Sequence, residues 1–129
     1  MKNSAILDPI GVSSRIEELK LLRFGWLDGR GVPPASDGLC WLSEAFEKHY
    51  PAELPLPYLF PTPEGQVLAE WPLKPWSGSL EIDLAEKRGE WHALNLATDA
   101  EEEKQLQLTE SNDWQWLAEQ IRSLNGEVE

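Results

Sequence analysis

The stretch VLAEWPLKPWSGSLEIDLAEKRGEWHALNL, residues 67–96, decides the fold of this chain. In its middle, residues 80–84 alternate apolar Leu and Ile with Glu81 and Asp83, the pattern of a strand with one buried and one solvated face. The same period of two begins at its first residue and returns after the turn at 85–89. Consecutive strands joined by short turns predict an antiparallel meander.

Helical patterns precede this region. Ser14-x-x-Glu17 has the form of a capping box in front of apolar residues at helical spacing. Ser36 or Asp37 is expected to cap a second helix, which ends before Pro51. The sequence therefore predicts two helices before the strands.

The rest of the chain completes one domain. A Pro-rich segment permits only a short edge strand at Tyr58–Phe60. After an acidic loop at 98–103, residues 105–108 alternate again, and a last helix begins at Ser111-Asn112. We therefore predict a single α+β domain over residues 1–129. It has an antiparallel meander of four to five strands, with two N-terminal helices and one C-terminal helix packed on one face.

Two loops carry recognisable motifs. The first is Gly25-Trp26-Leu27-Asp28-Gly29-Arg30-Gly31-Val32-Pro33-Pro34, and the second is Pro61-Thr62-Pro63-Glu64-Gly65-Gln66-Val67, followed by Glu70-Trp71 and Leu80-Glu81-Ile82-Asp83. Over residues 19–96 the chain resembles a family of small acidic bacterial proteins of unassigned function with the motifs W-D-G-x-G-x-x-P-P and P-T-P-x-G-x-V-x-x-E-W. It departs from that pattern at Leu27, which is inserted, and at Gln66, which replaces a Gly. The resemblance implies the fold and no activity.

The first motif also has an interpretation from its residues alone. Gly29 and Gly31 tolerate a positive φ, and Asp28 can accept a hydrogen bond from the backbone two residues on, so we expect a structural turn. A binding loop anchored by Trp26 and Arg30 is the alternative.

The acidity of the chain is concentrated in the half that holds the strands. Its net charge is −12; residues 1–60 carry 8 acidic and 6 basic side chains, and residues 61–129 carry 15 and 5. A surface this negative repels nucleic acid and anionic lipid and attracts basic partners. Lys and Arg form no basic stripe, and no apolar run reaches the roughly 18 residues of a membrane span, so we expect neither direct nucleic-acid binding nor membrane insertion.

Other features suggest a cytoplasmic protein without catalytic chemistry. The single Cys, Cys40, excludes an intrachain disulfide and a cysteine-based zinc site, and residues 1–14 lack a signal-peptide pattern. Cys40, beside Trp41, is expected to be a small buried side chain. We recognise no catalytic or cofactor motif, so we expect no enzyme and no cofactor.

The candidate binding residues are carboxylates and an exposed tryptophan. If residues 67–71 pair with 80–84, Glu70 and Glu81 lie close together. Trp76 follows Lys74-Pro75, where we expect an exposed loop. Trp is frequent at binding hot spots, and carboxylates around it suit a basic partner. The residues expected to contact the partner are Glu70, Glu81, Asp83, Trp76, Glu101, Glu102 and Glu103.

From these features we expect an intracellular protein-binding protein, of the antitoxin, immunity or inhibitor type, that covers a basic surface of its partner. One alternative is an accessory subunit that docks through Trp76 or Trp116. Another is a small metal-dependent enzyme that uses sheet carboxylates and His92, although His92 shares a strand face with Leu94 and is expected to point toward the core.

Overall fold

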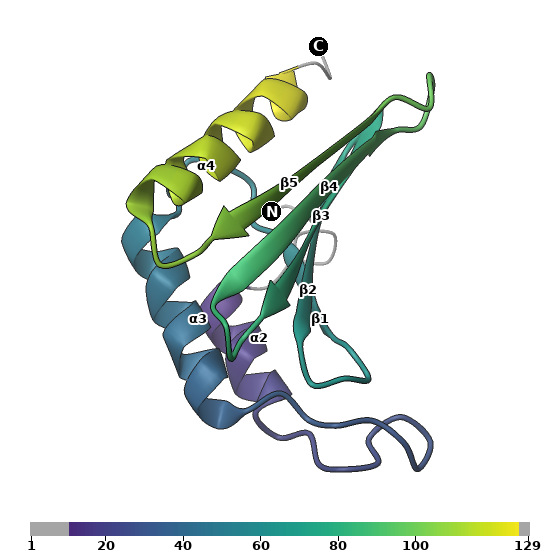
Figure 1. The fold of residues 1–129 in the computed structure, drawn as a ribbon, viewed down its shortest axis with the longest axis vertical. Coiled ribbons are helices and arrows are strands. Elements are labelled where there is room, and N and C mark those ends of the chain that lie inside the picture. Colours follow the sequence, from purple (N-terminus) through teal and green to yellow (C-terminus); the bar gives the residue numbers. More distant parts are fainter. Residues whose placement is uncertain (1–10, 127–129) are drawn as a thin grey trace, which may run out of the picture.

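The computed structural model describes residues 11–126 (Figure 1). The helices in this range are α2 (Val12–Leu19), α3 (Ser36–His49) and α4 (Ser111–Gly126). The strands are β1 (Tyr58–Pro61), β2 (Val67–Leu73), β3 (Trp76–Asp83), β4 (Arg88–Asn95) and β5 (Glu101–Gln107). None of the described helices is both long and apolar enough to cross a bilayer.

The five strands form one antiparallel sheet in the order β1-β2-β3-β4-β5, so every strand pairs with its neighbours in the chain. Figure 1 shows the three helices on one side of this sheet, and no helix within residues 11–126 covers the other side. The predicted α+β architecture, with two helices before the meander and one after it, is therefore confirmed. The short strand predicted at Tyr58–Phe60 is the edge strand β1.

The core lies between the sheet and the helices. Alternate residues of β2, β3 and β4 are buried there, because successive side chains of a strand point to opposite faces. Trp71 and Trp91 are both 1% exposed and their ring centroids lie 5.8 Å apart. Trp114 is equally buried, whereas Trp116 is half-buried and meets Trp91 edge-on. The last helix thus buries both of its tryptophans, one fully and one in part.

Tyr50 ties the end of α3 to the sheet. Its hydroxyl accepts a hydrogen bond from Trp71 Nε1 at 3.0 Å and donates one to the carbonyl oxygen of Pro55. Burial in this apolar setting disfavours the phenolate and raises the pKa of Tyr50 to about 12, although the hydrogen bond from Trp71 acts in the opposite direction.

Four local expectations are wrong. Ser14 caps no helix, because α2 already begins at Val12 and its N-cap Gly11 offers no side chain. Neither Ser36 nor Asp37 caps the second helix, because α3 already begins at Ser36 and its N-cap is Ala35. Cys40 is exposed, since α3 turns Leu39 and Leu42 toward the core. Trp76 is only 8% exposed: Lys74 and Pro75 form a two-residue turn, so β3 begins at Trp76 and this position faces the helices.

The expected turn at residues 25–31 is present. Gly25 N donates to the carbonyl of Gly31 at 2.9 Å, and Leu27 and Arg30 bridge in antiparallel fashion. Gly31 has a φ of +102°, and the indole ring of Trp26 lies directly beside its Cα, where a Cβ would come within 2.9 Å of Nε1. The half-buried Trp26 therefore packs on its own loop.

Candidate functional site

The uncovered side of the sheet is lined with carboxylates. Positions that alternate with the buried core residues point away from the helices, and six of them are acidic. We call this surface the acidic face. Its carboxylates belong to Glu70, Glu81, Asp83, Glu90, Glu101 and Glu103.

The strand register brings like charges together on this face. Glu81 lies directly opposite Glu90 across the β3–β4 pair, and Glu70 lies opposite Ser79, one pair further along the same face from Glu81. Like charges that face each other across two strands destabilise a sheet. Repulsion between these carboxylates therefore lowers the stability of the sheet relative to neutral residues at the same positions.

Most basic side chains near the sheet point to its helix-covered side and away from the acidic face. Lys104 in β5 places its ammonium 5.4 Å from the ring centroid of Trp116 on α4, and Lys87 lies 5.6 Å from that of Trp41 on α3. Both contacts are cation–π interactions on the helix side. Arg88 occupies a position on the acidic face, opposite Asp83 and Gln107. The cations and the carboxylates are thus largely segregated to opposite sides of the sheet.

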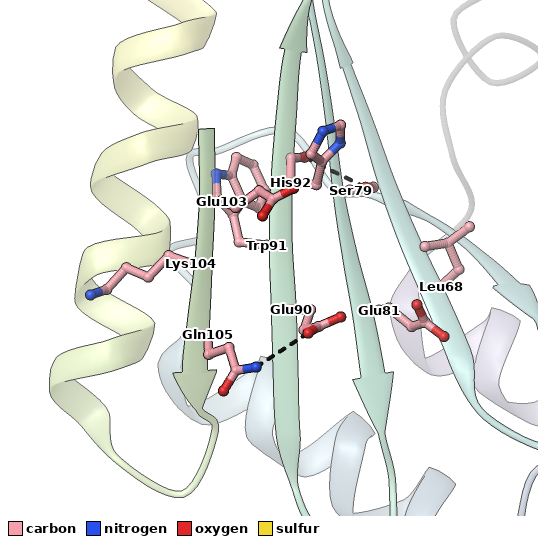
Figure 2. A pocket seen from close by; sticks show the side chains of 9 residues that line it. All are labelled: Leu68, Ser79, Glu81, Glu90, Trp91, His92, Glu103, Lys104 and Gln105. Carbon is pink, nitrogen blue, oxygen red and sulfur yellow. Dashed lines mark hydrogen bonds between the residues drawn. The ribbon is translucent and has the colours of Figure 1, made fainter. Parts of the chain in front are cut away.

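The acidic face is hollowed over β3, β4 and β5, as Figure 2 shows. The hollow has a volume of about 410 Å³ and is open to solvent. Inside it, Gln105 Nε2 donates to Glu90 Oε2 at 3.2 Å. A smaller hollow of about 190 Å³ adjoins it and shares Glu81, Glu90 and Gln105. The polar side chains that line the larger hollow are those of Ser79, Glu81, Glu90, His92, Glu103 and Gln105.

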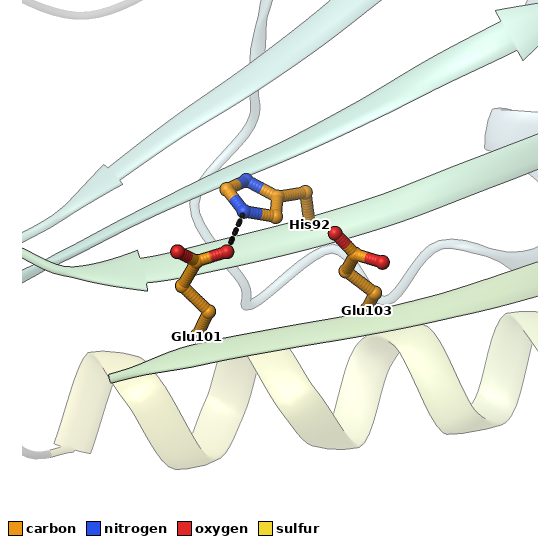
Figure 3. A group of neighbouring side chains, drawn as sticks. All are labelled: His92, Glu101 and Glu103. Carbon is orange, nitrogen blue, oxygen red and sulfur yellow. Dashed lines mark hydrogen bonds and ion pairs between the residues drawn. The ribbon is translucent and has the colours of Figure 1, made fainter. Parts of the chain in front are cut away.

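His92 lies on this face and not toward the core, so the expected orientation is wrong. Its neighbours Trp91 and Ala93 take the buried positions of β4, which turns His92 and Leu94 outward. His92 Nε2 lies 3.2 Å from Glu101 Oε1, and the His92 side chain is 41% exposed. Figure 3 shows Glu101 and Glu103 of β5 on either side of the imidazole. One ligand atom from each of these three residues lies within 4.8 Å of the other two.

The acidic run at 101–103 belongs to β5 and not to a loop, because it pairs with 92–94 of β4. Its three carboxylates therefore separate. Glu101 and Glu103 join the acidic face, whereas Glu102 lies opposite the buried Ala93 and leaves the strand on the helix side. Charged side chains on an edge strand also discourage pairing with other chains, which is a structural role for all three residues.

Of the other predicted contact residues, three lie on the acidic face and one is buried. Glu70 and Glu81 lie on the acidic face as expected, on neighbouring strands. Asp83 lies there too, but its Oδ1 accepts hydrogen bonds from the backbone N–H groups of Ala85 and Glu86, both at 3.0 Å, so it closes the β3–β4 turn. Trp76 is on the buried side and contributes little to the exposed surface.

The acidic face ends at an apolar border on β1 and β2. Phe60 is 40% exposed and lies opposite the half-buried Leu68. A partner that covers the face would therefore meet carboxylates along β2 to β5 and apolar surface at Phe60 and Leu68.

Sequence reasoning missed Glu90 as a site residue. The signal was present, because Glu90 stands one residue before Trp91, and a tryptophan in a strand commonly marks the buried phase. The comparisons add no further residue: no family model, curated protein or solved structure matches the chain.

Proposed function

We propose that this chain binds a basic protein through the acidic face and acts as an antitoxin, immunity protein or inhibitor that covers a basic surface of its partner. The observation that carries this proposal is the segregation of charge across the sheet. Two nearby lysines stack on tryptophans on the helix side, while the carboxylates of the uncovered face gather opposite them.

Physical reasoning favours a protein partner with clustered Lys and Arg. Within residues 11–126, Glu70, Glu81, Glu90 and Glu103 form no ion pair, so their charge is available to a partner. A concentrated negative field speeds association with a positive surface and sets its orientation. The basic surface of a nucleic-acid-binding protein has the matching chemistry. Phe60 and Leu68 supply apolar area next to the charges.

An accessory subunit that docks through exposed tryptophans has less support. Trp76 is buried, and Trp116 lies under the ammonium of Lys104 and against Trp91. Neither offers the exposed aromatic anchor that this alternative requires.

The test is affinity purification of the tagged protein from its host at low salt, followed by mass spectrometry and elution at high salt. The same experiment uses a neutralised variant, Glu70→Gln/Glu81→Gln/Glu90→Gln. A matched control, Glu44→Gln/Glu47→Gln/Glu119→Gln, removes the same number of charges from exposed positions of α3 and α4. We expect the wild type and the control to retain a basic partner that high salt releases, and the neutralised variant to lose it.

Two outcomes would contradict the proposal. If the partner resists high salt and binds the neutralised variant as well as the wild type, apolar docking holds the complex. If no partner is retained by the wild type at low salt, the acidic face has no basic protein to cover.

A further inference from the structure

We infer that His92, Glu101 and Glu103 form a binding site for one Zn²⁺ ion at the β4–β5 edge of the acidic face. These residues bring one imidazole and two carboxylates together from two paired strands (Figure 3). Imidazole nitrogen and carboxylate oxygen are ligands that Zn²⁺ accepts, and three protein ligands are the usual number where a fourth position stays open.

The distances suit a zinc ion after small rotations. Zinc–ligand bonds are about 2.0–2.2 Å long, so two ligands of one ion lie at most about 4.4 Å apart. His92 Nε2 and Glu101 Oε1 already satisfy this at 3.2 Å, and all three ligand atoms lie within 4.8 Å of one another. The Glu101 and Glu103 side chains are exposed, so they can rotate to close the remaining gap without moving the backbone.

The backbone presents these ligands in a defined register. Glu103 lies opposite His92. Glu101 stands two residues before Glu103 in β5 and therefore points to the same face. A continuous ladder of antiparallel pairs joins β4 and β5 from Arg88 to Leu94. The strand pairing therefore fixes which side chains meet.

The surrounding charge also favours a cation. Glu101 and Glu103 repel each other, and Lys104, the basic residue between Glu103 and Gln105, points to Trp116 on the helix side. A divalent ion would offset the repulsion more fully than a proton on His92. Because His92 and Glu103 also line the 410 Å³ hollow, the open coordination position would be available to water or to a donor group of a bound molecule.

The test is calorimetric titration of Zn²⁺ into tag-free protein in a Cys40→Ser background, since the exposed thiol of Cys40 is itself a zinc ligand. We expect one ion per chain. His92→Gln and Glu103→Gln should each weaken binding by about tenfold or more, because even loss of a residue that only orients a ligand costs about 10–100-fold. Glu81→Gln is the matched control: it removes the same charge from the same face outside the cluster and should leave the affinity within about twofold.

A second readout identifies the ligand directly. The chain has two histidines, so ¹⁵N-labelled histidine gives two imidazole environments. Zinc should shift the signals of His92 and leave those of His49, which stacks on Trp114 at 5.6 Å, unchanged. The inference is overturned if the wild type binds no stoichiometric ion, if Glu81→Gln weakens binding as much as Glu103→Gln, or if the His92 signals do not respond.

Discussion

Replacing Tyr50 by Phe tests the buried junction between α3, the Pro-rich segment and β2. The change removes one hydroxyl, which accepts from Trp71 Nε1 and donates to the Pro55 carbonyl. Trp71 Nε1 keeps a second acceptor, because the Pro55 carbonyl oxygen lies 3.2 Å from it. No buried donor is left without a partner, so near neutral pH we expect a loss of only about 1–2 kcal/mol in the free energy of unfolding.

The same variant should change the response to alkaline pH. Folding raises the pKa of Tyr50 from 10 to about 12. The neutral phenol therefore stabilises the folded wild type, and this contribution to the free energy of unfolding is complete below pH 10 and is lost as the pH approaches 12. One pKa unit corresponds to about 1.4 kcal/mol, so this contribution falls by about 1.3 kcal/mol between pH 9 and 11 and by about 2.7 kcal/mol in all. Phe has no such contribution.

The assay is urea unfolding of both proteins, followed by tryptophan fluorescence at intervals from pH 7 to pH 11. The difference in unfolding free energy between wild type and Tyr50→Phe should be constant from pH 7 to 9 and should then shrink by about 1.3 kcal/mol between pH 9 and 11. The plateau is the internal control. If the two stabilities fall in parallel above pH 10, burial does not hold Tyr50 neutral and the reasoning is wrong.

Two glycine substitutions test the packing elsewhere. Gly78→Ala should lower the free energy of unfolding by about 1–3 kcal/mol in a urea titration, since the new Cβ would lie 2.7 Å from Trp91 Cη2 inside the core; an unchanged midpoint would contradict this packing. Gly31→Ala should displace Trp26 from its loop and shift its indole N–H resonance, because the Cβ would lie 2.9 Å from Nε1. Gly29→Ala is the matched control, with a φ of +89° and no heavy atom within 4 Å, so an equal shift there would mean that backbone strain alone moves the ring.

The fold was largely predictable because period-two alternation reports directly on burial. In β3, Leu80 and Ile82 are completely buried, and Glu81 between them is exposed, as the pattern indicates. The spacing of Leu117 and Ile121 likewise marked the buried side of α4. Such patterns depend only on residues that are close in the chain, and they are sufficient to predict the helices, the strands and their order.

The site was less predictable, because its strands carry ambiguous patterns. In β4 the run around His92 has apolar residues in both phases, and the contacts of Trp91 with Trp71 and Trp116 decide which phase is buried. The run at 101–103 contains no apolar residue at all, so its strand conformation comes from pairing with β4. β-propensity depends on such pairing more than on the residue itself.

By itself, the amino-acid sequence determined an acidic α+β domain whose sheet carries carboxylates on its solvated side, because alternation and net charge are local and additive properties. The tertiary structure alone decided that Trp76 is buried, that Glu81 faces Glu90, and that His92 lies between Glu101 and Glu103. Each of these depends on which residues the strand register places opposite one another, and a shift of one residue would turn every side chain of the strand to the other face.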